Sequence, residues 1–194
     1  ELMYFNLLGI LFLIFIFLGI IGYWEFNPIP LAGAMTIVIF SVAVIYFLYL
    51  FALGNLSSEE KKKVTLIIVL FFGAALFWSG FDQAGSSFNI FAKEYTDRII
   101  LGWEYPASWL QVLNPLLVVM LSPFMAYLWI YLGKKMLDPS LPFKFGIGLI
   151  LMAVGFIFIA IGANIALQDG MASARWLLLT YLFHTLGELT LSPI

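Results

Sequence analysis

The stretch VTLIIVLFFGAALFWSGFDQAGSSFNIF, residues 64–91, decides the fold class of this chain. A helix rises about 1.5 Å per residue, and about 20 apolar residues suffice to cross a bilayer. The only charged residue of the stretch is Asp82. Further spans are predicted at Leu2–Trp24, Ile29–Leu53, Pro106–Leu132, Phe145–Leu167 and Trp176–Ile194. None of these runs alternates with a period of two, so we predict an all-α, polytopic membrane protein with six transmembrane helices.

The composition of the chain supports this class. Hydrophobic residues make up 63% and charged residues 10%, whereas a soluble globular protein has about 45–50% and about 25%. The mean hydropathy is +1.06. Because the chain has no cysteine, it offers no disulfide framework and no thiolate metal site. A net charge of −2 is too small to indicate a polyionic partner, so we expect no binding of nucleic acid.

Positive charges are distributed unevenly among the five predicted connections between the spans. In chain order, the connections carry 0, 3, 2, 3 and 1 lysine or arginine residues. The second connection is the polar stretch GNLSSEEKKK, residues 54–63, and the fourth is Gly133–Lys144. Because basic connections tend to stay in the cytoplasm, we predict that these two face inward and that the other three face outward.

Two acids, Asp82 and Glu188, lie inside predicted spans. A charge at the centre of a membrane helix costs about 2.5–3.5 kcal/mol on insertion scales, so such a residue usually faces the bundle, pairs with a partner or lines a water-filled path. Helix rise places Asp82 about 27 Å from the inner end of its span, which is near the outer face. Glu188 lies about 18 Å from the outer end of its span, and Asn114 lies about 12 Å down its own. We therefore expect Glu188 and Asn114 to share a central level, with Asp82 above them.

Each acid has polar or aromatic neighbours on its own helix face. One predicted face carries Trp78, Phe81, Asp82 and Gly85, and the other carries Tyr181, Thr185, Glu188 and Ser192. The two aromatic residues beside Asp82 fit a pocket wall as well as they fit ordinary helix packing. A structural ion pair or hydrogen bond remains an alternative for each acid. His184 lies one turn before Glu188, where an interhelical hydrogen bond is favoured over a proton relay.

The spans offer no recognisable catalytic constellation. HTLGEL, which begins at His184, has one histidine where a zinc protease helix needs two. The chain has no second buried aspartate for an intramembrane protease and no glycine-rich phosphate loop. The dipeptides Asn114-Pro115 and Ser122-Pro123 predict a bent helix with freed carbonyl groups. We therefore expect neither an enzyme nor a metal site.

Three segments resemble motifs of the proton-coupled oligopeptide transporters, a family of the major facilitator superfamily. They are FWSGFDQAGSS (Phe77–Ser87), QVLNPLLVVMLSPFMA (Gln111–Ala126) and TLGELTLSPI (Thr185–Ile194), and they are similar to parts of that family's seventh, eighth and tenth helices. The resemblance implies that residues 1–57 form a helical hairpin inserted between two six-helix halves. It implies that residues 58–194 are the first four helices of the C-terminal half, so that the chain is a partial protein.

The resemblance also implies roles for individual residues. Glu188 and Asn114 would hold the amino terminus of a bound di- or tripeptide, with Ser192 nearby. Trp78 and Phe81 would be aromatic residues of the pocket. Asp82 would pair with an arginine of the family's first helix in a closed outer gate. No family role is implied for His184.

Together these features predict proton-coupled symport of di- and tripeptides across the bacterial inner membrane by alternating access. The expected partners are the peptide, the lipid bilayer and the N-terminal half of the same protein, with protons as the coupling ion and no cofactor. Two alternatives stay open. One is a major facilitator carrier for a non-peptide solute, and the other is a non-transporting structural subunit of a membrane complex.

Overall fold

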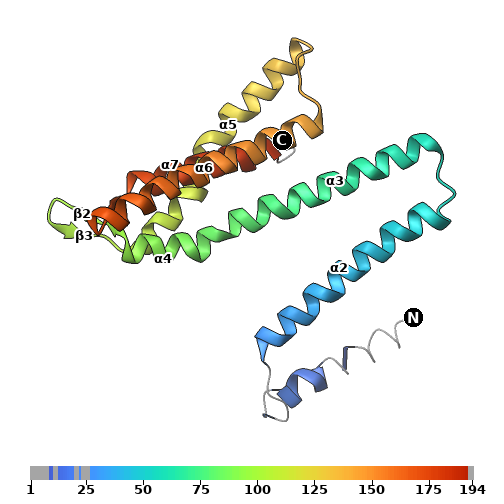
Figure 1. Ribbon diagram of the computed structural model, residues 1–194, viewed down its shortest axis with the longest axis horizontal. Coiled ribbons are helices and arrows are strands. Elements are labelled where there is room, and N and C mark those ends of the chain that lie inside the picture. The colour runs from blue at the N-terminus through green and yellow to red at the C-terminus, as the bar shows by residue number, and fades with distance from the viewer. Residues whose placement is uncertain (1–8, 11–12, 20–21, 23–26, 192–194) are drawn as a thin grey trace. The chain divides into compact units, whose positions relative to one another are not determined.

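The computed structural model describes residues 9–10, 13–19, 22 and 27–191. Four of its helices are long and apolar enough to cross a membrane, at Pro28–Leu53, Ser58–Glu94, Ala107–Lys134 and Leu141–Asp169. A further helix, α7, runs from Arg175 to Leu191 within the predicted last span. The predicted all-α, multi-pass membrane fold is therefore confirmed (Figure 1). The predicted span Leu2–Trp24 lies largely outside the described residues, and Ser192 lies entirely outside them.

The chain divides into two compact units, Glu1–Lys62 and Lys63–Ile194. In the first unit, helix α2 (Pro28–Leu53) contains no charged residue, and none of its side chains is buried by the described residues. A helix that is apolar on all sides is typical of a membrane span. Its start is capped by Asn27, whose side chain accepts a hydrogen bond from the Ile29 N–H at 3.1 Å. Its assignment to an inserted hairpin stays a prediction.

The connection after α2 is shorter than predicted, because helix α3 (Ser58–Phe81) begins before the lysine run. Ser57 and Glu60 form a reciprocal capping box. The Ser57 N–H donates to Glu60 Oε2 at 2.9 Å, and the Glu60 N–H donates to Ser57 Oγ at 3.3 Å. The helix therefore starts six residues before the predicted span boundary at Val64, within the polar stretch.

The span predicted at residues 64–91 is broken at the sequence DQAGSS. Helix α3 ends at Phe81, a 3₁₀ turn, η1, covers Asp82–Gly85, and helix α4 runs from Ser87 to Glu94. Ser86 between them has non-helical dihedral angles, φ −120° and ψ −91°. The Gln83 side chain accepts a hydrogen bond from Ser87 Oγ at 2.7 Å. Short polar side chains that bond locally in this way compete with the regular helix ladder.

The next span begins with the 3₁₀ turn η2 (Ala107–Val112) and continues as helix α5 (Leu113–Lys134). Pro123 inside α5 supplies no backbone donor. The neighbouring Ser122 hydroxyl donates to the Val118 carbonyl at 2.6 Å. The helix thus lacks one backbone donor at this point, and the predicted bend of α5 stays a prediction.

Two connections meet at one end of the second unit. Strand β1 (Thr96–Asp97) pairs in parallel with β4 (Ala172–Ser173), so the third and fifth connections lie on the same side, as predicted for antiparallel spans. Strands β2 (Ile99–Ile100) and β3 (Trp103–Glu104) form a short hairpin. The Arg98 guanidinium closes its base by donating to the Tyr105 carbonyl at 2.6 Å and to Glu104 at 2.5 Å. Burial raises the pKa of the Tyr105 phenol, and the charge of Arg98 partly offsets this effect.

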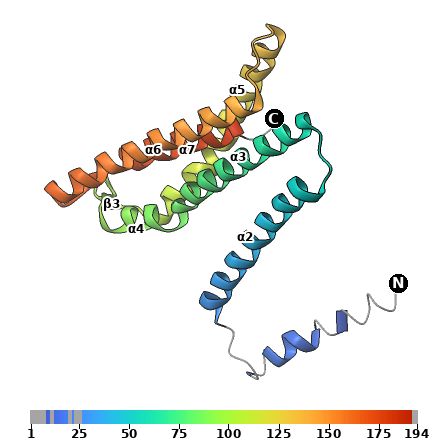
Figure 2. The same ribbon diagram turned by 45° about the vertical axis from the view of Figure 1, so that its right-hand side comes forward.

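Helices α6 (Leu141–Asp169) and α7 pack along a seam of glycines. They lie side by side in both ribbon views (Figures 1 and 2). Gly148, Gly155 and Gly162 recur every seven residues on α6, and all three are buried. Small residues at this spacing allow two membrane helices to approach closely.

Each of these glycines faces a larger side chain of α7. A Cβ atom at Gly148 would lie 2.9 Å from Leu191 Cγ, and one at Gly162 would lie 2.8 Å from Trp176 Cβ. At Gly155 it would meet the His184 ring, 2.6 Å from Nε2. The seam therefore has no room for even a methyl group.

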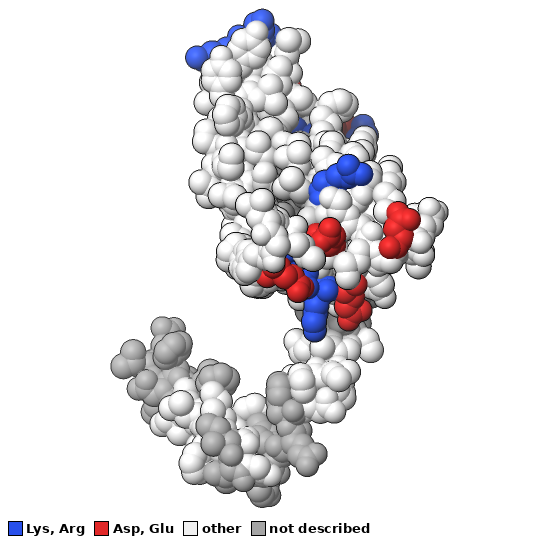
Figure 3. Space-filling model, turned by 90° about the vertical axis from the view of Figure 1, so that its left-hand side faces the viewer, with Lys and Arg blue, Asp and Glu red and all other residues white. Residues whose placement is uncertain are grey.

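The core of the second unit lies between α4, η2 and α7. Its buried members are Phe88, Ala92, Tyr105, Leu110, Leu177 and Tyr181. On the face drawn in Figure 3, charged side chains gather in separate groups, with broad uncharged surface between them. This distribution fits a protein whose helices are surrounded by lipid.

Candidate binding site

A polar cluster joins helices α5 and α7 in the second unit. The Asn114 side chain, in the first turn of α5, donates through Nδ2 to Thr185 Oγ1 at 3.0 Å and to Glu188 Oε2 at 3.3 Å. The structure therefore brings Asn114 and Glu188 to one level, as helix rise predicts. Both bonds use Nδ2 of Asn114. The side-chain oxygen Oδ1 of Asn114 and Glu188 Oε1 therefore stay available as acceptors among residues 27–191.

The geometry of helix α7 explains why these groups converge. Tyr181, Thr185 and Glu188 follow each other at spacings of four and three, which puts them on one helix face. Thr185 is fully buried and Glu188 is half-buried. His184 and Gly187 lie on the face that packs against the glycine seam of α6. One helix thus has a packing face and a polar face.

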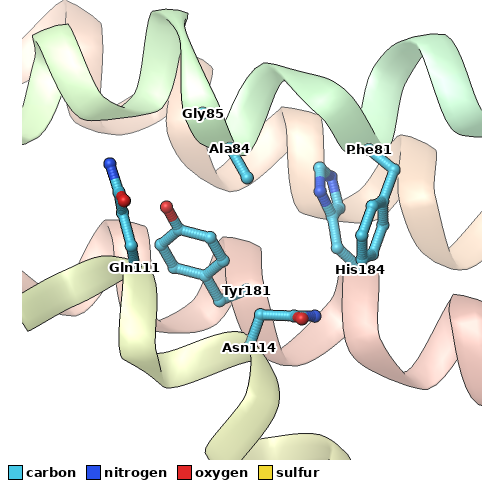
Figure 4. A pocket seen from close by; sticks show the side chains of 7 residues that line it. All are labelled: Phe81, Ala84, Gly85, Gln111, Asn114, Tyr181 and His184. Atoms are coloured by element: carbon cyan, nitrogen blue, oxygen red, sulfur yellow. The ribbon is translucent and has the colours of Figure 1, made fainter. Parts of the chain in front are cut away.

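A cavity of about 140 Å³ lies beside the polar cluster (Figure 4). It is lined by Phe81, Ala84, Gly85, Gln111, Asn114, Tyr181 and His184. Residues from the broken helix at DQAGSS, from η2, from the start of α5 and from α7 therefore all reach it. The break in the span predicted at residues 64–91 contributes directly, because Ala84 and Gly85 belong to the 3₁₀ turn.

The two predicted pocket aromatics behave differently. Phe81 lines the cavity, whereas Trp78 does not and is 49% exposed. Trp78 packs edge-on against Phe81, with ring centroids 5.3 Å apart. The indole of Trp78 thus extends the aromatic surface outside this cavity, and its role in a pocket stays a prediction.

Asp82 opens the 3₁₀ turn and is exposed. Within residues 27–191, the ion pairs are Lys62–Glu59, Arg98–Glu104 and Lys144–Asp138, so Asp82 has no ionic partner in this part of the chain. No hydrogen bond links it to Glu188 there. The expectation that the two acids are not partners agrees with this geometry, and the gate role of Asp82 stays a prediction.

His184 is held by packing on the α6 side of α7. It is 2% exposed, and its ring centroid lies 5.6 Å from that of Phe88 and 5.0 Å from that of Phe156. Its Nε2 is buried without a hydrogen-bond partner among the described residues. The interhelical hydrogen bond that was favoured from the sequence stays a prediction. No hydrogen bond connects His184 with Glu188 among the described residues.

Sequence reasoning missed part of the cavity wall. Gln111 lies one turn before Asn114, a spacing that would have placed both side chains on the same side of the chain. Gly85 was placed on the face of Phe81 but was not assigned to a pocket, and Ala84 was not placed on that face. In the part of the chain that the structure describes, no group of three or more His, Cys, Asp or Glu side chains could hold a metal ion.

The sequence matches the model of the POT family, PTR2, over residues 31–194. The chain belongs to the POT family. It is 39% identical over 175 residues to the peptide transporter YePEPT of Yersinia enterocolitica subsp. palearctica, covering 89% of this chain and 34% of that protein. It is 36% identical over 137 residues to the dipeptide and tripeptide permease B of Aliivibrio fischeri, covering 70% of this chain and 28% of that protein. It thus spans about a third of the length of these relatives.

Solved POT structures share the fold of this chain. A crystal structure of the peptide transporter POT in complex with sulfate matches 97% of this chain and 38% of its own, with a TM-score of 0.76 and 28% identity. A POT family transporter in complex with 5-aminolevulinic acid matches 98% of this chain and 40% of its own, with a TM-score of 0.72 and 29% identity. The family resemblance and the membrane fold expected from the sequence are both confirmed.

Proposed function

We propose that this chain is part of a proton-coupled symporter that carries di- and tripeptides across the bacterial inner membrane by alternating access. The cluster of Asn114, Thr185 and Glu188 is the observation that carries the proposal. Two relatives, named as a peptide transporter and as a dipeptide and tripeptide permease, support peptides as the substrate class. The N-terminal half of the protein would supply the remaining contacts.

The chemistry of the cluster suits a substrate ammonium group. An ammonium donates three hydrogen bonds and carries one positive charge. Glu188 offers the opposite charge and a free carboxylate oxygen, and the Asn114 carbonyl oxygen offers a second acceptor beside it. The Asn114 amide already orients the carboxylate through the 3.3 Å hydrogen bond. In a site with little water such charge-assisted hydrogen bonds are stronger than in solution.

Proton coupling would follow from competition at Glu188. An ionised carboxylate in a membrane protein needs a counter-charge, which the substrate ammonium or a proton can provide. Because symport carries the proton and the substrate in the same direction, a proton that enters with the substrate on another group of the intact protein would pass to Glu188 and displace the ammonium on the inner side, so that substrate release and protonation become linked. Rocking of the two halves about this level would then expose the site to each side in turn.

Asp82, Trp78 and Ser192 take supporting roles in this proposal. Asp82 is exposed and lacks an ionic partner within residues 27–191, so it is available to an arginine of the first half as an outer latch. Trp78 and Phe81 present aromatic surface toward a bound peptide. Ser192 lies one helical turn beyond Glu188 in the sequence and would add a polar contact.

Gradient-driven dipeptide uptake into proteoliposomes by the intact protein tests the proposal. Glu188→Gln keeps the size of the side chain and removes the exchangeable charge, so uptake driven by a proton gradient should fall by at least about tenfold. Glu94→Gln, at the exposed end of α4, is the matched control and should transport normally. Full gradient-driven uptake by Glu188→Gln would contradict the coupling role.

A further inference from the structure

We propose that the hairpin of β2 and β3 is an interfacial anchor, whose tip inserts between the headgroups and the acyl chains of the adjacent membrane leaflet. The tip is defined as residues 99–103, with the sequence IILGW. On the predicted orientation this leaflet is the outer one. Its partner is the lipid itself. This anchoring does not depend on the proposed transport of peptides, because it needs only spans that cross a bilayer.

The tip is apolar and open. Leu101 is fully exposed, and Ile99, Ile100 and Trp103 are each more than half exposed. Successive residues of a strand point to opposite sides, so the exposure of Ile99 and Ile100 means that the described residues cover neither side of β2. A tip that is apolar on both sides suits a medium that surrounds it, such as lipid.

The turn at the tip favours a different residue from the one it contains. Leu101 and Gly102 have φ of 52° and 81°, the positive values of a two-residue type I′ turn. Asn and Gly are preferred there, whereas a bulky side chain at positive φ is strained. In water, a leucine at this position would combine backbone strain with an exposed apolar side chain. Contact with lipid removes the second disadvantage and gives the leucine a role that asparagine cannot fill.

The charges nearest the tip are held at the base of the hairpin. Residues 99–103 carry none, and Arg98 and Glu104 stand on either side of them. The largely buried Arg98 guanidinium donates to the carbonyl groups of Lys93 and Tyr105 and pairs with Glu104. An ion-paired base beside an uncharged tip matches the change in polarity at a membrane surface.

The level of the hairpin follows from its contact with a span. The Trp103 ring packs edge-on against the Trp109 ring, with centroids 5.3 Å apart. Trp109 belongs to η2, which opens the candidate membrane span Ala107–Lys134. Both rings line a hollow of about 260 Å³ together with Ile100, Tyr105, Leu110 and Leu113. The tip therefore lies where this span enters the bilayer, beside α4 in Figure 1, and tryptophan is enriched at that level.

A spin label reports the depth of the tip. The chain has no cysteine, so Leu101→Cys places a single label in this part of the intact protein, after any cysteine elsewhere has been replaced. In liposomes, collisions with oxygen, which concentrates in hydrocarbon, are compared with collisions with a water-soluble nickel chelate. The label should lie about 5–10 Å into the boundary of headgroups and acyl chains, the depth reached by interfacial helices. Asp169→Cys, at the exposed end of α6, is the control and should collide freely with the chelate.

A matched pair of substitutions tests whether the apolar tip sets this depth. Leu101→Asn suits the positive φ and removes the apolar side chain, so a label at Ile99→Cys should move toward water and collide several-fold more often with the chelate. Met136→Asn is the control, because Met136 is also exposed with a φ of 57° but lies beyond the other end of α5. It should leave the label where it is. An unchanged depth in Leu101→Asn would overturn the anchor.

The depth measurement itself has two contrary outcomes. If the labels at Leu101→Cys and Asp169→Cys collide equally with the chelate, the tip lies in water and the proposal fails. If the label at Leu101→Cys is shielded from both reagents, protein covers the tip, and the N-terminal half takes the place proposed for lipid. Access to oxygen with exclusion of the chelate supports the anchor. None of these results bears on peptide transport, which the uptake assay tests separately.

Discussion

Helix α7 meets α6 and α5 in two different ways. Toward α6 it presents Trp176, His184 and Leu191, each against a glycine that leaves no room for a methyl group. Toward α5 it presents Thr185 and Glu188, which share the single amide of Asn114 beside a cavity of about 140 Å³. One side is close-packed and has no space for a ligand, whereas the other has exchangeable hydrogen bonds and space for a ligand.

This difference suggests that one face of α7 positions the helix and that the other face binds the ligand. The glycine seam fixes the position and rotation of α7, because interdigitated side chains leave no alternative arrangement. The polar face can then hold Glu188 at a defined level without being filled by packing. Changes on the seam should therefore act on stability, and changes on the polar face should act on ligand binding.

The largest effect is expected from breaking the seam. Gly155→Val places a branched side chain where the His184 ring lies, so α6 and α7 must separate. Overpacking usually costs about 1–3 kcal/mol and occasionally more, and here we expect the yield of monodisperse protein in detergent to collapse. Gly146→Val on the same helix is the control, because a Cβ atom there meets nothing within 4 Å. Equal yields of the two variants would contradict a tight seam.

The second largest effect concerns His184, which belongs to the seam although it also lines the cavity. His184→Ala removes the ring that packs against Phe88 and Phe156. We expect a loss of about 2–4 kcal/mol, measured as a lower midpoint of thermal unfolding in detergent. Gradient-driven uptake per folded molecule should persist. Abolished uptake at unchanged stability would instead make His184 a proton relay.

On the polar face, Asn114→Ala should weaken dipeptide binding by about tenfold to a hundredfold, since a charged group then loses its hydrogen-bond partner. The melting temperature should change little, because the cavity already makes this region less densely packed. Asn164→Ala is the control, as its side chain bonds only to Gln168 on the exposed surface of α6 among the described residues. A stability loss without a change in affinity would place Asn114 with the packing residues.

The smallest effects come from two buried threonines of α7. The Thr180 hydroxyl lies within hydrogen-bonding distance of two carbonyl groups, 2.8 Å from that of Trp176 in its own helix and 3.1 Å from that of Gly155 on the seam. Thr185 instead accepts from Asn114 on the polar face. Thr180→Val should lower stability by about 0.5–1.5 kcal/mol with normal peptide affinity. Thr185→Val should lower affinity a few-fold. Both variants are measured for thermal unfolding and for peptide binding. An affinity loss in Thr180→Val together with a stability loss in Thr185→Val would contradict the separate roles of the two faces.

Much of the polar face could be predicted from the sequence. Glu188 could be singled out because acids are rare in apolar spans. The shared depth of Glu188 and Asn114 then follows from helix rise alone. The seam could not be predicted in the same way. Gly148, Gly155 and Gly162 are visible at heptad spacing, but their spacing does not say which helix they face.

The break at DQAGSS was missed for a different reason. Hydropathy measures how well side chains dissolve in lipid and is insensitive to local hydrogen bonds such as that from Ser87 to Gln83. The shortened connection before α3 has the same kind of cause. The cap of Ser57 and Glu60 consists of hydrogen bonds from backbone N–H groups to side chains, which hydropathy does not measure. Both errors affected boundaries, and the first also concealed Ala84 as part of the cavity wall.

The central claim is that the polar face of α7 binds a substrate ammonium through Glu188. It is tested most directly by a thermodynamic cycle in which the intact wild-type protein and Glu188→Gln each bind Leu-Ala and N-acetyl-Leu-Ala, which lacks the ammonium. Acetylation should weaken binding to the wild type by at least about a hundredfold and should make little further difference in Glu188→Gln, because the two changes remove the same interaction. Equal discrimination against the acetylated peptide by both proteins would contradict the claim.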